Sequence, residues 1–410
     1  HPSPDVRAAS VRTLAATGGS TDLSAIAACL RDSDSDVKVA VVAAMTRMGD
    51  DSHRHQVALE IEALASADTP DRVVLAARML GGCEPGTSID RSALRVMLDA
   101  HDDDVVNAAL AAIRWPHDQE LLTDVVGHLD NRATARAAVD ALARSGEAAL
   151  GLVDEGFRGE LRLGQHGHEQ LARVCRTIGG SRAAAVLWRH VDHHDREVGL
   201  AVMTALAAFD PSDANTQLAV GADLEHAGYV LQALLAVADI ESAGVLRSAL
   251  SDELELLRRR VVAGLSIRYG ADALSRVEFQ LAQRSPRFHA LALEWLDVTL
   301  VGIDRAAVVL LEPGLATRER LRALVKWFPI PPSTPHAILL DLVDDPDGRW
   351  RRPWLAACAL LAADDTSEPA FEVLARAVTV ELPIGEVGDP MLIVRETLEG
   401  IRQRQTVRHA

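Results

Sequence analysis

The sequence has few aromatic residues, few lysines and few cysteines. Aromatic side chains make up 3% of its 410 residues, and only two lysines, Lys38 and Lys326, are present. The four cysteines are scattered without a C-x-x-C pair, which argues against a zinc site and favours reduced thiols in a cytosolic setting. Because no uninterrupted apolar run of about 18 residues occurs, the sequence predicts no membrane-spanning segment.

Positive charge is also in deficit, because the formal net charge is −17 at pH 7. An acidic chain is repelled by nucleic acid and by anionic lipid, so we expect neither as a partner. The abundant residues are small and aliphatic, and alanine and leucine are good helix formers. No signal peptide is visible, and the sequence begins at His1 inside a helical pattern, so we expect a segment of a longer polypeptide.

One pattern recurs along the chain. Residues 32–50, DSDSDVKVAVVAAMTRMGD, and residues 193–211, HHDREVGLAVMTALAAFDP, both place acids in a turn before apolar residues at steps of three and four. Those steps put the apolar side chains on one face of a helix. The register recurs every 29 to 36 residues, at Val6, Val37, Thr69, Val105, Thr134, Gly167 and Val198. It continues more loosely near Gly228, Arg258, Phe288, Arg320 and Trp350.

A period of this length is typical of a solenoid, in which each helix pair buries its apolar face against its neighbours. Second helices of the pairs are predicted at 23–30, 120–129 and 183–191. We therefore predict an all-α fold, an α-α superhelix (a HEAT-like solenoid) of about 11–12 helix pairs. Asp or Ser side chains in the acidic turns are expected to cap the helices that follow.

The predicted organisation has three parts. Residues 1–210 form regular repeats, and residues 211–327 form divergent repeats that keep the period but lose the acidic turn. Residues 328–410 form a proline-rich break followed by a C-terminal helical cap, since the prolines at 329–335 cannot lie inside a helix.

The repeated turn resembles that of a known family. Its acid, valine and spaced alanines, carried by Asp5–Arg7, Asp36–Gly49 and Asp104–Ala112, resemble the bacterial HEAT-repeat (PBS-lyase-like HEAT) family over about residues 1–210. Residues 253–300 and 345–363 look like the helical-repeat segment of large bacterial membrane proteins. In those proteins an ATP/ADP-carrier-like transporter domain precedes the HEAT repeats and a cyclic nucleotide-binding domain follows. The resemblance implies a cytoplasmic segment, or one at the cytoplasmic face of a membrane.

Two basic groups are candidate partner-binding sites. The sequence RWRRPW at 349–354 places two tryptophans beside three arginines, a composition common at interface hot spots, and a second group holds three consecutive arginines. The candidate residues are Arg349, Trp350, Arg351, Arg352, Trp354, Arg258, Arg259 and Arg260. Two alternatives stay open: the tryptophans cap a core, or the arginines pair with glutamates on the same helices. Pro353 predicts a helix start, so Trp350 precedes that helix and Trp354 lies in its first turn.

The candidate metal sites have weaker patterns. The segment His193–Asp195 offers ligands, but it occupies the turn that residues 32–36 occupy in an earlier repeat, so we favour a capping turn. Residues 32–43 imitate a calcium loop, yet Val37 and Ala43 stand where glycine and glutamate are required. HEAT-like hydroxylases use several His-Glu pairs, and only His168–Glu169 is present. We expect no metal, no cofactor and no catalytic residue.

The function predicted from these observations is a non-catalytic HEAT-repeat scaffold. It would bind a protein partner or neighbouring domains of the same polypeptide, without nucleic acid and without inserting into a membrane. The resemblance implies a regulatory or spacer segment of a larger membrane transporter-like protein. The first alternative is a free-standing HEAT adaptor. The second is a HEAT-type nucleic-acid-binding protein or metal-dependent enzyme, against which the charge and the missing ligands argue.

Overall fold

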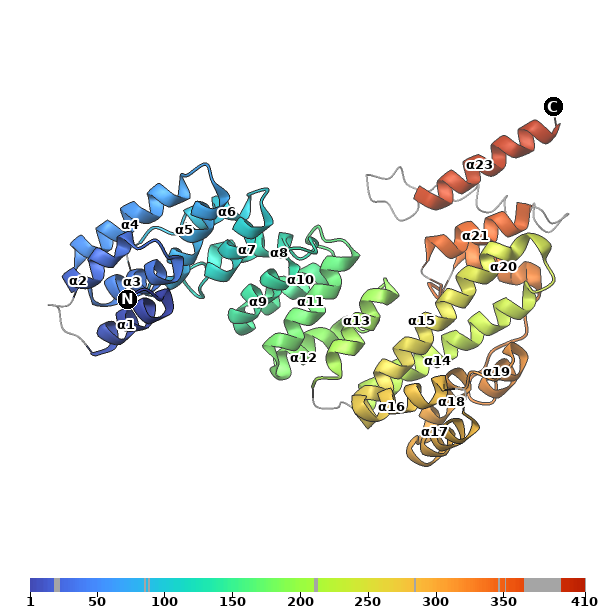
Figure 1. Ribbon diagram of the computed structural model, residues 1–410. Coiled ribbons are helices and arrows are strands. Elements are labelled where there is room, and N and C mark those ends of the chain that lie inside the picture. The colour runs from blue at the N-terminus through green and yellow to red at the C-terminus, as the bar shows by residue number, and fades with distance from the viewer. Residues whose placement is uncertain are drawn as a thin grey trace. The chain divides into compact units, whose positions relative to one another are not determined.

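The computed structural model describes residues 1–17, 23–84, 86–87, 89–209, 213–283, 285–345, 347–350, 352–364 and 392–409. These ranges contain 22 α-helices and no strand, which confirms the predicted all-α fold of packed helix pairs (Figure 1). The chain divides into two compact units, His1–Leu187 and Trp188–Ala410, each with its own packing. Every helix in the described ranges is too short or too polar to cross a bilayer.

The first unit is built from short helices in two alternating sets. One set packs in a row, each helix against the next: α1 (Pro4–Thr17), α3 (Ser35–Met48), α5 (Pro70–Gly82), α7 (Asp103–Ala112), α9 (Ala135–Arg144) and α11 (Gln165–Ile178). The other set packs against them: α2 (Leu23–Ala28), α4 (Asp51–Ala65), α6 (Ala93–Leu98), α8 (Leu122–Gly127) and α10 (Leu150–Phe157). Helix α12 (Gly180–Arg189) follows α11 in the chain. The predicted register positions lie at the starts of the first set, so the repeat is confirmed here.

The acidic turns cap the helices that follow them. Asp34 accepts hydrogen bonds from two backbone N–H groups in the first turn of α3, at 2.9 and 3.2 Å. Asp102 does the same at the start of α7, with the same two distances. These carboxylates satisfy amides that have no partner inside the helix, and they lie at the positive end of its dipole. The predicted capping role of the acids is confirmed at both turns.

Arginines near the ends of three helices connect successive repeats. Each donates a hydrogen bond to a carbonyl in the last turn of the preceding helix of the row, where no intrahelical donor exists. The pairs are Arg47 with Ala15, Arg114 with Gly81 (2.6 Å) and Arg144 with Leu110 (2.7 Å). These inter-repeat arginines therefore fix each helix to its neighbour through the backbone.

The second unit is organised around two long helices. Its helices are α13 (Arg196–Leu206), α14 (Asp213–Ala236), α15 (Gly244–Tyr269), α16 (Ala271–Ala282), α17 (Pro286–Thr299), α18 (Val308–Leu311), α19 (Thr317–Leu324), α20 (Pro335–Asp344), α21 (Pro353–Asp364) and α23 (Leu392–His409). Helices α14 and α15 have 24 and 26 residues and pack side by side (Figure 1). Helix α15 also contacts α13, α16 and α21.

These long helices overturn part of the predicted repeat. Gly228 and Arg258 lie in the middle of α14 and α15, where the sequence predicted register positions at helix starts. No turn residues interrupt the buried apolar positions on either side of them, so each helix continues through the expected break. The later positions Phe288, Arg320 and Trp350 do lie at, or just before, the starts of helices.

The proline-rich segment packs against α14. Phe328 and Ile330 are each 6% exposed, and Ile330 Cδ1 lies 2.0 Å from where a Cβ on Gly228 would be. Only glycine therefore allows this close approach. One hydrophobic core joins side chains from Val220 to Ile401. The predicted boundaries at 210 and 327 do not coincide with the observed division after Leu187.

We expect Asp102→Ala to lower the free energy of unfolding by about 1 kcal/mol, because two first-turn amides of α7 lose their acceptor. The measurement is urea unfolding followed by circular dichroism. Glu62→Ala, at an exposed position inside α4, is the control and is expected to change stability by less than about 0.5 kcal/mol. Equal effects of the two substitutions would show that the cap contributes nothing.

Candidate functional site

The segment Arg349–Trp354 crosses the start of α21, and its two tryptophans lie in opposite environments. Trp350 is 1% exposed and precedes the helix, whereas Trp354 is 47% exposed in its first turn. The predicted helix start at Pro353 is confirmed. Arg351 lies outside the described residues.

Trp350 is part of the core of the second unit. Its indole N–H donates to Asp341 at 2.9 Å, and its backbone N–H donates to the Asp345 carboxylate at 3.0 Å. Its ring meets the His226 ring edge-on, with centroids 5.4 Å apart. The structure therefore assigns Trp350 the core-capping role that the sequence left open, and it corrects the prediction that Trp350 contacts a partner.

Arg349 is held on several sides by the same unit. Its guanidinium lies 3.9 Å from the centre of the Tyr229 ring and 3.2 Å from the carboxylates of Asp341 and Asp347. Its backbone carbonyl accepts a hydrogen bond from Arg196 at 2.7 Å. The positive charge of Arg349 is thus largely balanced by the two carboxylates and the aromatic ring that it contacts within the chain.

A buried carboxylate, Glu253 of α15, lies against two arginines and a histidine from three other segments. It is 1% exposed and lies 3.0 Å from Arg196 of α13, 2.8 Å from Arg352 before α21, and 3.5 Å from His226 of α14. We name Arg196, His226, Glu253 and Arg352 the Glu253 cluster. Since a buried charge is costly unless it is paired, the cluster fixes how these four segments meet.

Burial and charge shift the pKa values in this cluster. Burial lowers the pKa of His226 to about 4, although its contact with Glu253 opposes the shift, so the imidazole is neutral at pH 7. Burial alone would raise the pKa of Glu253. The contact with His226 and the charges of Arg352 and Arg196 outweigh that effect and lower it, so Glu253 is ionised. Burial also lowers the pKa of Arg196.

Arg260, another predicted partner-binding residue, lies in a second buried ion pair. It is 2% exposed, and its Nε is 2.9 and 3.1 Å from the two carboxylate oxygens of Asp223 on α14. Its guanidinium also donates to the Val191 carbonyl at 3.3 Å. Burial raises the pKa of Asp223 against the opposing charge of Arg260. Arg260 is therefore unavailable to a partner at the surface, which corrects that prediction.

The side chain of Arg260 passes very close to the backbone of Gly199. A Cβ on Gly199 of α13 would lie 2.2 Å from Arg260 Nη1 and 3.0 Å from the Val191 carbonyl oxygen. To make room, the guanidinium would have to leave its contacts with Asp223 and with the Val191 carbonyl. The glycine inside α13 is thus explained by the arginine of α15.

The other two arginines of the triad are closer to the surface. Arg258 pairs with Glu255 at 2.9 Å, as the alternative of pairing on the same helix predicted, and also with Glu278 of α16 at 3.0 Å. Arg259 has a side chain that is 54% exposed, and its nearest acid is Glu197 at 3.9 Å. The triad therefore does not form one basic surface.

The sequence interpretation did not identify Asp223 or His226, and it considered Glu253 only as a partner of arginines on its own helix. Asp223 and His226 are polar residues among the buried apolar residues of α14, and Glu253 is a charged residue among those of α15. A charged residue at a buried helix position is a signal that could have identified them. Their partners could not have been found this way, because Arg260 lies 37 residues from Asp223 in the sequence.

The histidine turn at His193–Asp195 has a structural role. Asp195 accepts a hydrogen bond from the Glu197 N–H at 2.9 Å and thereby caps α13. The rings of His193 and His194 stack with centroids 4.1 Å apart. Throughout the part of the chain that the structure describes, no group of three His, Cys, Asp or Glu side chains has the arrangement of a metal site. The favoured interpretation of a capping turn is thus confirmed for Asp195.

The first unit has a cavity of about 380 Å³ between the loops that follow α5 and α7. Arg91 lines it, with Nε and Nη2 2.7 and 2.8 Å from the Asp118 carboxylate and Nη1 2.7 Å from the Leu80 carbonyl oxygen. Arg114 lines it too and is one of the inter-repeat arginines. Since these groups already bind one another, we assign the cavity no ligand.

No protein-family model, curated protein or solved structure matches this chain. The interactions at this site are structural: they fix the position of one helix against its neighbours. Paired charges hold the start of α21 against α13, α14 and α15, and leave Trp354 exposed beside it.

We expect Glu253→Gln to lower the free energy of unfolding by about 3 kcal/mol, because it leaves Arg196 and Arg352 without their buried counter-charge. Urea unfolding at pH 7 measures the loss. The control is Glu255→Gln on the same helix, whose side chain is 56% exposed, with an expected change below about 1 kcal/mol. Comparable losses for the two variants would contradict a special role for the cluster.

His226 makes stability depend on pH. Its pKa is about 4 in the folded chain against an ordinary 6.5, so between these values the unfolded chain binds a proton that the folded chain does not. Stability is therefore full above pH 6.5 and falls as the pH drops toward 4, by about 2 kcal/mol between pH 7 and pH 5. We expect His226→Gln to remove this part of the pH dependence of the urea midpoint. His101→Gln, at an exposed histidine, serves as the control and is expected to keep it.

Proposed function

We propose that the chain is a non-catalytic protein-interaction scaffold whose partner site in the second unit centres on Trp354. The observation that carries the proposal is the exposure of this tryptophan, 47%, in the first turn of a helix that the Glu253 cluster holds in place. A rigidly held aromatic side chain loses little conformational freedom when a partner covers it. Arg352 lies two residues before Trp354, and its pairing with Glu253 at 2.8 Å fixes the start of this helix.

Other features support a role without catalysis. The charged side chains of the Glu253 cluster pair with one another, so none of them is positioned to transfer a proton to a bound molecule. Burial raises the pKa of the Cys83 and Cys358 thiols to about 11, so these two cysteines are protonated and are poor nucleophiles at pH 7.

The partner is a protein or a neighbouring domain of the same polypeptide. The spacer role beside a transporter-like domain, the HEAT-repeat family and the cytoplasmic location stay predictions from the sequence resemblance. They are compatible with a stack of short helix pairs that is joined by inter-repeat arginines.

An affinity experiment tests the proposed site. The immobilised chain is compared with its Trp354→Ala variant in extracts of the source cells, with bound proteins measured by quantitative mass spectrometry. We expect a specific set of proteins to fall at least tenfold on Trp354→Ala. The control is Trp327→Ala, at another tryptophan of the same unit, which is 45% exposed, and it is expected to retain them. Identical binding by all three proteins would remove Trp354 from the partner site.

A further inference from the structure

One face of α19 carries a row of exposed cations. Arg318 and Arg322 lie one helical turn apart in α19, and Lys326 lies four residues further on, in a turn whose backbone hydrogen bonds continue the helix. Steps of four residues place the three side chains along the same face. We name Arg318, Arg322 and Lys326 the α19 basic row.

The α19 basic row has no counter-ion within the chain. Its three side chains are exposed and make no hydrogen bond or ion pair with the described residues. The carboxylate of Glu319, the nearest acid in the sequence, instead accepts a hydrogen bond from the Ala316 N–H at 3.2 Å. Arg320, on the opposite side of the helix, differs from the row because its guanidinium donates to the Glu312 carbonyl at 2.8 Å.

The charge of this segment is opposite to that of the whole chain. Between Glu312 and Asp341 the sequence has four basic residues and one acid, a net charge of +3 (4 − 1), whereas the chain carries −17. Like charges four residues apart on a helix repel each other, and Arg318 lies in the first turn, where the helix dipole disfavours a cation. The stability of α19 therefore does not explain the row.

A row of carboxylates on another molecule does explain it. Arginine binds a carboxylate through two parallel hydrogen bonds. Successive cations of the row are separated by about 6 Å along the helix axis, and acids at every fourth residue of a partner helix recur at the same spacing. Val325 is 47% exposed and lies on the same face, three residues after Arg322, so it offers an apolar contact beside the cations.

The net charge of the chain favours a short acidic partner over a long one. Repulsion by a net charge of −17 grows with the number of negative charges on the approaching molecule, so it is strongest for nucleic acid and for an anionic membrane. A short run of acids meets the least repulsion while it still matches the row. We propose that the α19 basic row is a docking site for an acidic segment of a protein partner.

The contact is weak and depends on salt. Each exposed ion pair contributes little by itself, and dissolved ions screen it. Binding therefore requires all three cations together. This inference is independent of the partner site at Trp354, which lies on a different helix and is tested by a different substitution.

Fluorescence anisotropy of a labelled peptide, titrated with the whole chain at low salt, tests the proposal. The probe is a short alanine-based helical peptide with glutamate at every fourth position and a leucine beside each glutamate. We expect the wild type to bind it and to lose affinity as salt is added. Replacing the three cations of the row together (Arg318→Gln, Arg322→Gln and Lys326→Gln) is expected to weaken binding about tenfold.

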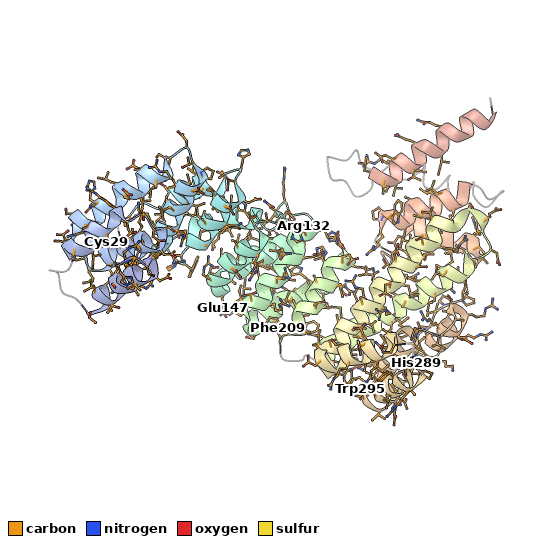
Figure 2. The ribbon with its side chains drawn as sticks, in the orientation of Figure 1. Cys29, Arg132, Glu147, Phe209, His289 and Trp295 are labelled. Atoms are coloured by element: carbon orange, nitrogen blue, oxygen red, sulfur yellow. The ribbon has the colours of Figure 1, made fainter. Side chains whose placement is uncertain are left out.

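The matched control removes the same charge from the first unit. It combines Arg72→Gln, Arg132→Gln and Arg136→Gln, at exposed arginines that also make no ion pair with the described residues, and Arg132 is labelled in Figure 2. This variant is expected to bind the peptide as the wild type does. Circular dichroism confirms that both triple variants fold.

A second pair of probes distinguishes an acidic protein segment from other anions. The same peptide with glutamine in place of glutamate is expected not to bind, and a short oligothymidylate strand is expected to bind about tenfold more weakly than the acidic peptide. Three results would each overturn the proposal: a wild type that does not bind the acidic peptide, a row variant that binds as the control does, or an oligothymidylate that binds as tightly as the peptide.

Discussion

The ends of the helices set the main physical constraint on this chain. Each short helix leaves amides at its start and carbonyls at its end that have no partner within the helix, and burying them unpaired is costly. The first unit solves this in two ways, and helices α3 and α7 use both. Carboxylates such as Asp34 and Asp102 accept from the amides, and the inter-repeat arginines donate to the carbonyls of the preceding helix. Where an arginine does this, the bond that satisfies a helix end also joins two neighbouring helices.

The second unit avoids unpaired backbone groups in a different way, because it has fewer helix ends near its centre. Helices α14 and α15 run for 24 and 26 residues, so their middle parts satisfy every backbone group internally. Buried ion pairs join the neighbouring segments to these two helices instead. Glu253 pairs with Arg196 and Arg352, and Asp223 pairs with Arg260. A buried pair of this kind adds little net stability, but it penalises any arrangement that separates the charges.

Local chemistry was predictable from the sequence, and long-range pairing was not. The caps at Asp34 and Asp102 and the helix start at Pro353 follow from residue type and position, because the groups involved are at most a few residues apart. The burial of Trp350 depends on His226, 124 residues away (350 − 226), and no local pattern encodes such a distance. The composition of RWRRPW was informative, but it could not show which tryptophan would face the solvent.

Gly199 has a consequence for how this sequence can change over generations. A side chain at this position collides with Arg260 Nη1, so replacing the glycine forces the guanidinium out of its contacts with Val191 and Asp223. Losing the arginine first strands Asp223 in the core without its counter-charge. The three positions, on three different helices, are therefore coupled: a change at any one of them alone leaves a collision or an unpaired buried charge, so accepted substitutions must arrive together.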